Sequence, residues 1–186
     1  MTLTTNRLIL RPFTLNDVDA VQSCGGNPEN VRYMSWGPNT LEQTRNFLDF
    51  VIKRAENEPC RDYDFAVVLK ETGAVIGSCG INVDGSGAKG QLCWILHLDF
   101  HKNGYGTELA AELIRFGFEE LKLHRIFAPC AAVNYGSYRV MERNGMRREA
   151  THVKDFWVRI DKEWIDMAVY AILAEEWWAR KLLSEA

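Results

Sequence analysis

One stretch of this chain joins a loop with two glycines to an amphipathic helix. It covers residues 101–121 and reads HKNGYGTELAAELIRFGFEEL. Apolar residues recur at helical spacing and predict the buried stripe of a helix: Ala110, Leu113, Ile114, Gly117 and Leu121. Polar residues alternate with them and predict a solvated face: Glu108, Glu112, Arg115, Glu119 and Lys122. The apolar run QLCWILHL, residues 91–98, precedes the loop, so strand, loop and helix form one unit.

The loop itself predicts an anion site. Gly104 and Gly106 remove side chains where the backbone turns, so the N–H groups of residues 103–107 can converge on a ligand at the positive end of the helix dipole. A simpler interpretation is that both glycines only shape a strand-to-helix turn. Ligands gather at strand ends of this kind, and the preceding strand therefore favours the anion site.

Two common nucleotide motifs do not fit the loop. Leu109 stands where a dinucleotide fingerprint has its third glycine, and Gly106 stands where a Walker loop has its lysine. Residues 101–106, HKNGYG, instead resemble the Gln/Arg-x-x-Gly-x-Gly/Ala signature of the GCN5-related N-acetyltransferases (GNAT). Residues 107–109, TEL, resemble the Thr-Glu-Ala of the RimJ/RimL-like branch, which acetylates ribosomal-protein alanines. His101 departs from the signature.

A second motif follows at the distance that the family shows. Residues 134–146, NYGSYRVMERNGM, resemble its Asn-x-x-Ser-x-x-Val-x-Glu-Lys-x-Gly-Phe segment. The resemblance implies that Asn134 bonds the pantetheine arm of acetyl-CoA and that Ser137 protonates the departing thiolate. Without the resemblance, both residues are ordinary helix caps. It also implies further coenzyme contacts, by backbone or side chain, at Leu96, Leu98, Lys102, Asn103, Gly104, Tyr105, Gly106, Thr107 and Arg143.

Composition narrows the class of protein. The chain has 186 residues, of which 47% are hydrophobic and 25% charged, and this predicts one globular domain over residues 1–186. A net charge of −3 gives no broad positive field for nucleic acid or an anionic membrane. Five cysteines without a CxxC pair, and no apolar leader or spanning segment, predict a reducing, cytoplasmic location. No metal is expected.

The remaining segments predict alternating strands and helices. Strands are expected at residues 7–13, 64–69, 74–83, 91–98, 125–133, 146–158 and 163–173. Helices are expected after Thr14, after Thr40, at residues 134–144 and in the terminal tail. The expected fold is α/β (α+β), a mixed and mostly antiparallel sheet of about seven strands with about four flanking helices. The resemblance adds two splayed strands that form the acetyl-CoA cleft.

Three features carry weaker expectations. The aromatic loop of residues 32–38 either closes a substrate cleft or packs on the core. His97 and Asp99, at the expected strand end, are candidate bases, although strand alternation favours structural roles for them. Trp177 and Trp178 on the terminal helix predict a homodimer, because they exceed what a small core can cover.

These expectations converge on an N-acetyltransferase that moves the acetyl group of acetyl-CoA to a primary amine through a ternary complex. The acceptor is either a protein N-terminal alanine, as the resembled branch suggests, or a small-molecule amine. An alternative is an acyl-CoA-binding regulatory or assembly protein without turnover. A nucleotide-binding module is the least supported of the three classes, because its motifs are absent.

Overall fold

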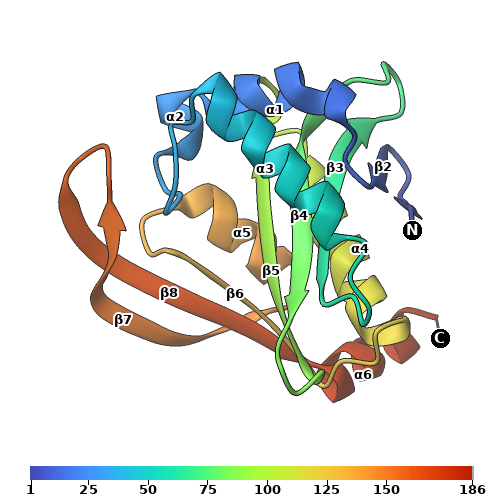
Figure 1. The fold of residues 1–186 in the computed structure, drawn as a ribbon. Coiled ribbons are helices and arrows are strands. Elements are labelled where there is room, and N and C mark those ends of the chain that lie inside the picture. Colours follow the sequence, from blue (N-terminus) through green and yellow to red (C-terminus); the bar gives the residue numbers. More distant parts are fainter. Residues whose placement is uncertain (186) are drawn as a thin grey trace.

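The computed structural model describes residues 1–185 as one twisted sheet with helices on both faces (Figure 1). Its strands are β1 (Leu3–Thr4), β2 (Leu8–Arg11), β3 (Asp62–Leu69), β4 (Val75–Val83), β5 (Lys89–Leu96), β6 (Arg125–Ala131), β7 (Arg147–Val158) and β8 (Glu163–Leu173). Its α-helices are α1 (Val18–Gly25), α2 (Pro28–Val31), α3 (Leu41–Arg54), α4 (Tyr105–Glu119), α5 (Tyr135–Arg143) and α6 (Ala174–Glu185). Short 3-10 turns, η1 (Leu15–Asp17) and η2 (Leu98–Phe100), precede α1 and α4.

The strand order is β1-β2-β3-β4-β5-β6-β8-β7, and within residues 1–185 only β5 and β6 run parallel. The mixed, mostly antiparallel α/β fold is thus confirmed. The sheet has eight strands in this range, because the two-residue β1 adds to the expected ones. The pairing of β5 with β6 spans only Lys89–Gln91 against Arg125–Phe127, and beyond it the two strands diverge. The expected splay is therefore present at the middle of the sheet.

Helix α4 covers one face of the sheet, while α1 and α3 cover the other (Figure 1). On the α4 side, Phe116 is fully buried and meets the rings of Tyr63 and Phe65 edge to face at 5.2 and 6.3 Å. Gly117 permits this close packing, since a Cβ there would lie 2.6 Å from Ile126 Cδ1. Each fully buried large apolar side chain contributes roughly 1.5–3 kcal/mol, so this core fixes the position of α4 against the strands.

The polar stripe of α4 lies at the surface, as the sequence predicts, and ion pairs link its side chains. Glu108 is largely covered, because Arg7 and Thr5 from the β1–β2 turn bond its carboxylate. Further along the helix, Arg115 pairs with Glu112 and Glu119 at 2.7 and 2.9 Å. These ion pairs partly cover a stripe whose polar side chains are half-buried or exposed, so the predicted solvated face is confirmed.

The predicted helix starts are confirmed by their caps. The Thr40 hydroxyl accepts from the Gln43 N–H at the start of α3, and Asn134 caps α5. The strand predicted at residues 91–98 ends earlier, at Leu96, because the chain turns into η2 with the His97 ring accepting from the Asp99 N–H at 3.3 Å. No helix within residues 1–185 is long and apolar enough to cross a membrane.

Candidate active site

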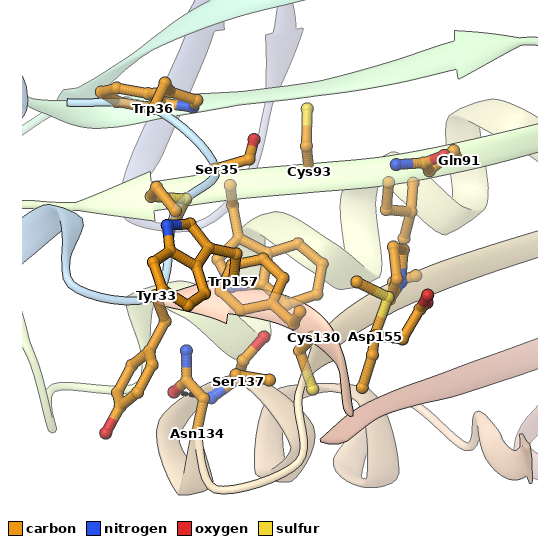
Figure 2. Close-up of a pocket in the computed structure, with 18 of the residues that line it drawn as sticks. Tyr33, Ser35, Trp36, Gln91, Cys93, Cys130, Asn134, Ser137, Asp155 and Trp157 are labelled. Carbon is orange, nitrogen blue, oxygen red and sulfur yellow. Dashed lines mark hydrogen bonds between the residues drawn. The ribbon is translucent and has the colours of Figure 1, made fainter. Parts of the chain in front are cut away.

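A cavity of about 850 Å³ opens where β5 and β6 separate (Figure 2). Its floor comes from β5, through Gln91–Trp94, and from β6, through Ala128–Ala131. Pro129 has no N–H to offer a neighbouring strand, and it stands in the part of β6 that has lost β5 as a partner. The cavity is therefore a consequence of the interrupted ladder.

Asn134 and Ser137 lie at one wall of this cavity, at the start of α5 (Figure 2). The side-chain oxygen Oδ1 of Asn134 accepts a hydrogen bond from the Ser137 backbone N–H at 3.2 Å, so Asn134 is the N-cap of α5. The Ser137 hydroxyl is not needed for that cap. Burial raises the pKa of the Cys130 thiol in β6 to about 11, and the nearby Ser137 hydroxyl opposes that rise.

The predicted anion loop is a strained turn that leads directly into α4. Lys102 and Gly104 both have left-handed backbones, with φ of 63° and 80°. Gly104 is the N-cap of α4, so the N–H groups of the first helical turn, from Tyr105 onward, have no carbonyl partner inside the helix. Glycine fits this backbone without strain, whereas Lys102 bears it at a cost.

Arg7 clamps this loop from the outside. Its Nε donates to Glu108 at 2.7 Å, its Nη1 donates to the Asn103 carbonyl at 2.9 Å, and its guanidinium lies 4.5 Å above the Tyr105 ring. The Arg7 backbone N–H and the Thr5 hydroxyl also donate to Glu108, at 2.7 and 2.6 Å. The loop is thus held by the N-terminal strand pair, a partner that local sequence reasoning did not find.

The two sequence motifs meet in space. Asn144, at the end of α5, donates to the Thr107 carbonyl at 3.1 Å, and a Cβ on Gly106 would lie 3.1 Å from Val140 Cγ2. The glycine therefore lets α5 approach the start of α4. Lys102 and Arg143, predicted to attract phosphates, are both exposed.

The end of β5 is fixed by Asn30, a buried residue of α2. Its amide donates to the Leu96 carbonyl at 3.1 Å, and its carbonyl oxygen accepts from the Leu98 N–H at 2.8 Å. The ring of His101 turns back to the same Leu96 carbonyl, at 2.9 Å. The two predicted coenzyme contacts, Leu96 and Leu98, hence carry protein partners on these atoms, and their coenzyme role stays a prediction.

The candidate bases from the sequence do not line the cavity. His97 and Asp99 belong to the turn after β5, and Asp99 points largely to solvent. The carboxylate that does line it, among the residues that the structure describes, is Asp155 of β7, which bonds His152 at 3.2 Å. Sequence reasoning missed Asp155, since nothing near it in the chain indicates a site.

The aromatic loop after α2 packs partly on the core and partly lines the cavity, and its closure over a substrate stays a prediction. Val31 is buried with Met34 packed beside it, in a small cluster around Cys24. Tyr33 and Trp36 instead line the cavity, and Trp36 is 40% exposed. On the far wall, Trp157 and Trp164 come from the β7–β8 hairpin and were not predicted.

A second, smaller cavity of about 330 Å³ lies between the same loop, α1 and the middle of the sheet. Cys93, Trp94, Met34 and Trp36 line both cavities, so the two adjoin. The Cys93 side chain is exposed to the cavities, and the protein packed around it raises the pKa of its thiol to about 12, with Asp64 adding to the rise. The thiol is therefore protonated at neutral pH.

Comparisons with known proteins agree with this geometry. A family model described as "Acetyltransferase (GNAT) domain" matches residues 7–147. The uncharacterized N-acetyltransferase YnaD of Bacillus subtilis (strain 168) is 32% identical over 177 residues, which cover 95% of this chain and 99% of the relative. The crystal structure of an acetyltransferase (GNAT family) from Bacillus anthracis is 33% identical, with a TM-score of 0.83 and coverage of 95% and 100%.

A more distant likeness concerns the fold alone. RimL, a ribosomal-protein acetyltransferase whose structure holds coenzyme A, is 15% identical to this chain. Its TM-score is 0.81, and the match covers 93% of this chain and 98% of that one. The fold is thus shared far beyond recognisable sequence.

Proposed function

This chain belongs to the GNAT family of acetyltransferases, and on that premise we propose that its gap between β5 and β6 is where acetyl-CoA and an acceptor amine meet. The observation that carries the proposal is the position of Ser137, which stands at the wall of the gap with a hydroxyl that the helix cap does not use. We further propose that residues 1–186 act as one acetyltransferase domain.

The residues present fit acetyl-CoA. The unpaired N–H groups at the start of α4, behind Gly104 and Gly106, suit its pyrophosphate, with Lys102 and Arg143 as exposed cations for its phosphates. Asn103, Tyr105 and Thr107 supply the remaining backbone of that loop. The floor of the gap suits the pantetheine arm, with Asn134 beside it. Leu96 ends β5 and Leu98 follows in the next turn, and their backbone is proposed to contact the same arm.

When bound, acetyl-CoA supplies a thioester whose carbonyl carbon is open to attack by an amine. The acceptor nitrogen forms the new C–N bond, the C–S bond breaks, and the coenzyme leaves as the thiol. Ser137 is proposed to give its proton to the departing sulfur, and the proton lost by the nitrogen replaces it through water. Asp155 attracts the ammonium form of the acceptor to the cavity. That ammonium first gives one proton to water, which leaves the neutral amine that attacks, and the second proton, lost after attack, is the one that returns to Ser137.

The experiment is a turnover assay in which the free thiol of CoA is detected while a panel of primary amines is offered with acetyl-CoA. The panel includes peptides with an N-terminal alanine, polyamines and small aromatic or aliphatic amines. Thiol release that depends on both the amine and the enzyme supports the proposal. Tight binding of acetyl-CoA without turnover on any amine contradicts it.

Two further properties are proposed with the function. All five cysteines are free thiols, which suits a reducing cytoplasm.

Trp177 packs on Phe118 within its own chain, so it no longer supports a dimer. Trp178, Leu182 and Leu183 of α6 remain exposed, at 41%, 68% and 81%, and we propose that this strip joins two copies.

A further inference from the structure

Two exposed tryptophans of the β7–β8 hairpin form one wall of the larger cavity. Trp157 and Trp164 face each other across the strands, with ring centroids 5.4 Å apart and planes inclined by 52°. They are 38% and 53% exposed, although both are large apolar groups that would gain by burial. Exposed tryptophans beside a cavity are typical of a binding surface.

The hairpin backbone is irregular in a way that turns side chains into the cavity. The register of β7 against β8 shifts between His152 and Phe156, and Lys154 in that bulge has a φ of 52°. The Lys154 N–H donates to the Asp166 carboxylate at 2.9 Å, which holds the bulge. Bulges re-aim the residues that follow them, and here Asp155, Phe156 and Trp157 all line the cavity instead of alternating between faces.

The opposite aromatic side chains, Tyr33 and Trp36, belong to the loop after α2 (Figure 2). This loop is tied to the hairpin turn by Arg32, whose guanidinium bonds Asp161 through two N–H groups at 3.0 and 3.1 Å. The same guanidinium lies 6.0 Å from the Tyr33 ring centroid. The two aromatic walls are therefore fixed relative to each other across the cavity.

The charge of the cavity is nearly balanced. Its charged lining side chains, within residues 1–185, are Asp155 and Arg159, so a single carboxylate is available for a cation. A polyamine or a polycationic sugar needs several acids to replace its lost hydration. One ammonium group needs only one carboxylate, and cation–π attraction to nearby indole rings also stabilises it.

We propose that the acceptor is a small primary amine carried on a planar aromatic ring. The ring stacks on Trp157 and Trp164 opposite Tyr33 and Trp36, and Asp155 draws the amine in. The proposal rests on the acetyl transfer described above and narrows its acceptor. Stacking accounts for what charge alone does not, namely five aromatic lining side chains, counting Phe156, that come from two elements far apart in the sequence.

The test uses tryptamine as the probe, with spermidine and an alanine-initial hexapeptide as rivals at saturating acetyl-CoA. We expect kcat/KM for tryptamine to exceed that of either rival at least tenfold. Trp157→Ala and Trp164→Ala should each raise the KM for tryptamine at least tenfold and change kcat little. Phe50→Ala removes an exposed aromatic side chain of α3, outside both cavities, and should leave both constants unchanged.

A preference for spermidine or the hexapeptide would overturn the proposal, as would an unchanged KM in the Trp157→Ala protein. Calorimetry on the free protein separates this result from a failure of the acetyl transfer. If acetyl-CoA does not bind but tryptamine binds the wild type and not the Trp157→Ala variant, only the proposed reaction fails. If tryptamine does not bind, the aromatic acceptor is wrong even where acetyl transfer to another amine is observed.

Discussion

Arg7 bonds Glu108 at 2.7 Å and so joins the N-terminal strand pair to the first turn of α4. The same guanidinium donates a hydrogen bond to the Asn103 carbonyl. Arg7 therefore contacts the outer side of the predicted phosphate loop, and the N–H groups of that loop stay available to a ligand. Arg7 is thus a positioning residue. Its distance in sequence from the loop, about a hundred residues, explains why no local motif identifies it.

Arg7→Met should weaken acetyl-CoA binding by roughly tenfold, because a displaced loop misaligns the N–H groups that meet the pyrophosphate. The fall should appear in the Kd and KM for acetyl-CoA, with kcat nearly unchanged. Arg45→Met, at an exposed arginine of α3 on the other face, is the control. Calorimetry with CoA measures the effect, and equal affinities in the two variants would contradict the role.

Glu108 should also make stability depend on pH. Burial opposes ionisation, but hydrogen bonds from Thr5 and Arg7 outweigh it and lower the pKa of Glu108 from 4.5. Its contribution is complete above pH 4.5 and is lost as the pH falls through the lowered value. Glu108→Gln should cost about 1–2 kcal/mol at pH 7 and less at pH 3.5. Urea unfolding at both values tests this, with Glu71→Gln in an exposed turn as control.

Ser137→Ala separates catalysis from capping, because Asn134 caps α5 through the backbone N–H of Ser137. The variant should keep its melting temperature and its CoA affinity while turnover falls by about 10²–10⁴. Asn134→Ala should instead cost about 1 kcal/mol of stability. Ser35→Ala removes another hydroxyl that lines the cavity and should change turnover little. Full activity of Ser137→Ala would end the acid role.

Gly104→Val should abolish measurable coenzyme binding, since a β-branched residue is strained at a φ of 80° and relief of that strain moves the loop. Gly73→Val is a matched control. Gly73 has a φ of 72° in the turn between β3 and β4, with open space around the added side chain. Both variants should lose stability to a similar extent. Only the Gly104 variant should lose affinity for CoA in calorimetry.

The α6 strip should hold two copies together through Trp178 and Leu182. Sedimentation velocity at high protein concentration should show a dimer, and Leu182→Glu should convert it to monomer because a charge would be buried. Leu15→Glu places the same charge at an exposed leucine of η1 and should leave the dimer intact. A wild type that stays monomeric at high concentration refutes this surface.

Local signals explain what could be predicted from the sequence. The helix starts at Thr40 and Asn134 follow from capping side chains, and α4 follows from its apolar periodicity. Gly104 was expected to turn the backbone, and its positive φ confirms that expectation. Each of these features depends on residues within a few positions of one another.

The rest depends on contacts between distant segments. β5 ends at Leu96 because the side chain of Asn30, 66 residues earlier, donates a hydrogen bond to the Leu96 carbonyl and accepts one from the Leu98 N–H. Trp157 and Asp155 enter the cavity only because a bulge and a long hairpin bring them there. Pro129 was a usable signal for the gap, since a proline inside a central strand suggests a missing partner.

The short pairing between β5 and β6 has a consequence for amide hydrogen exchange. The central strands of a sheet are ordinarily its slowest-exchanging part, because both edges of each strand are bonded. Here the ladder is interrupted at the centre, beyond Gln91 and Phe127. Amides of β6 that face the gap should exchange with solvent almost as fast as those of an edge strand, and a ligand that fills the gap should slow them. Deuterium uptake by the middle of this sheet would then measure directly whether a ligand occupies the gap.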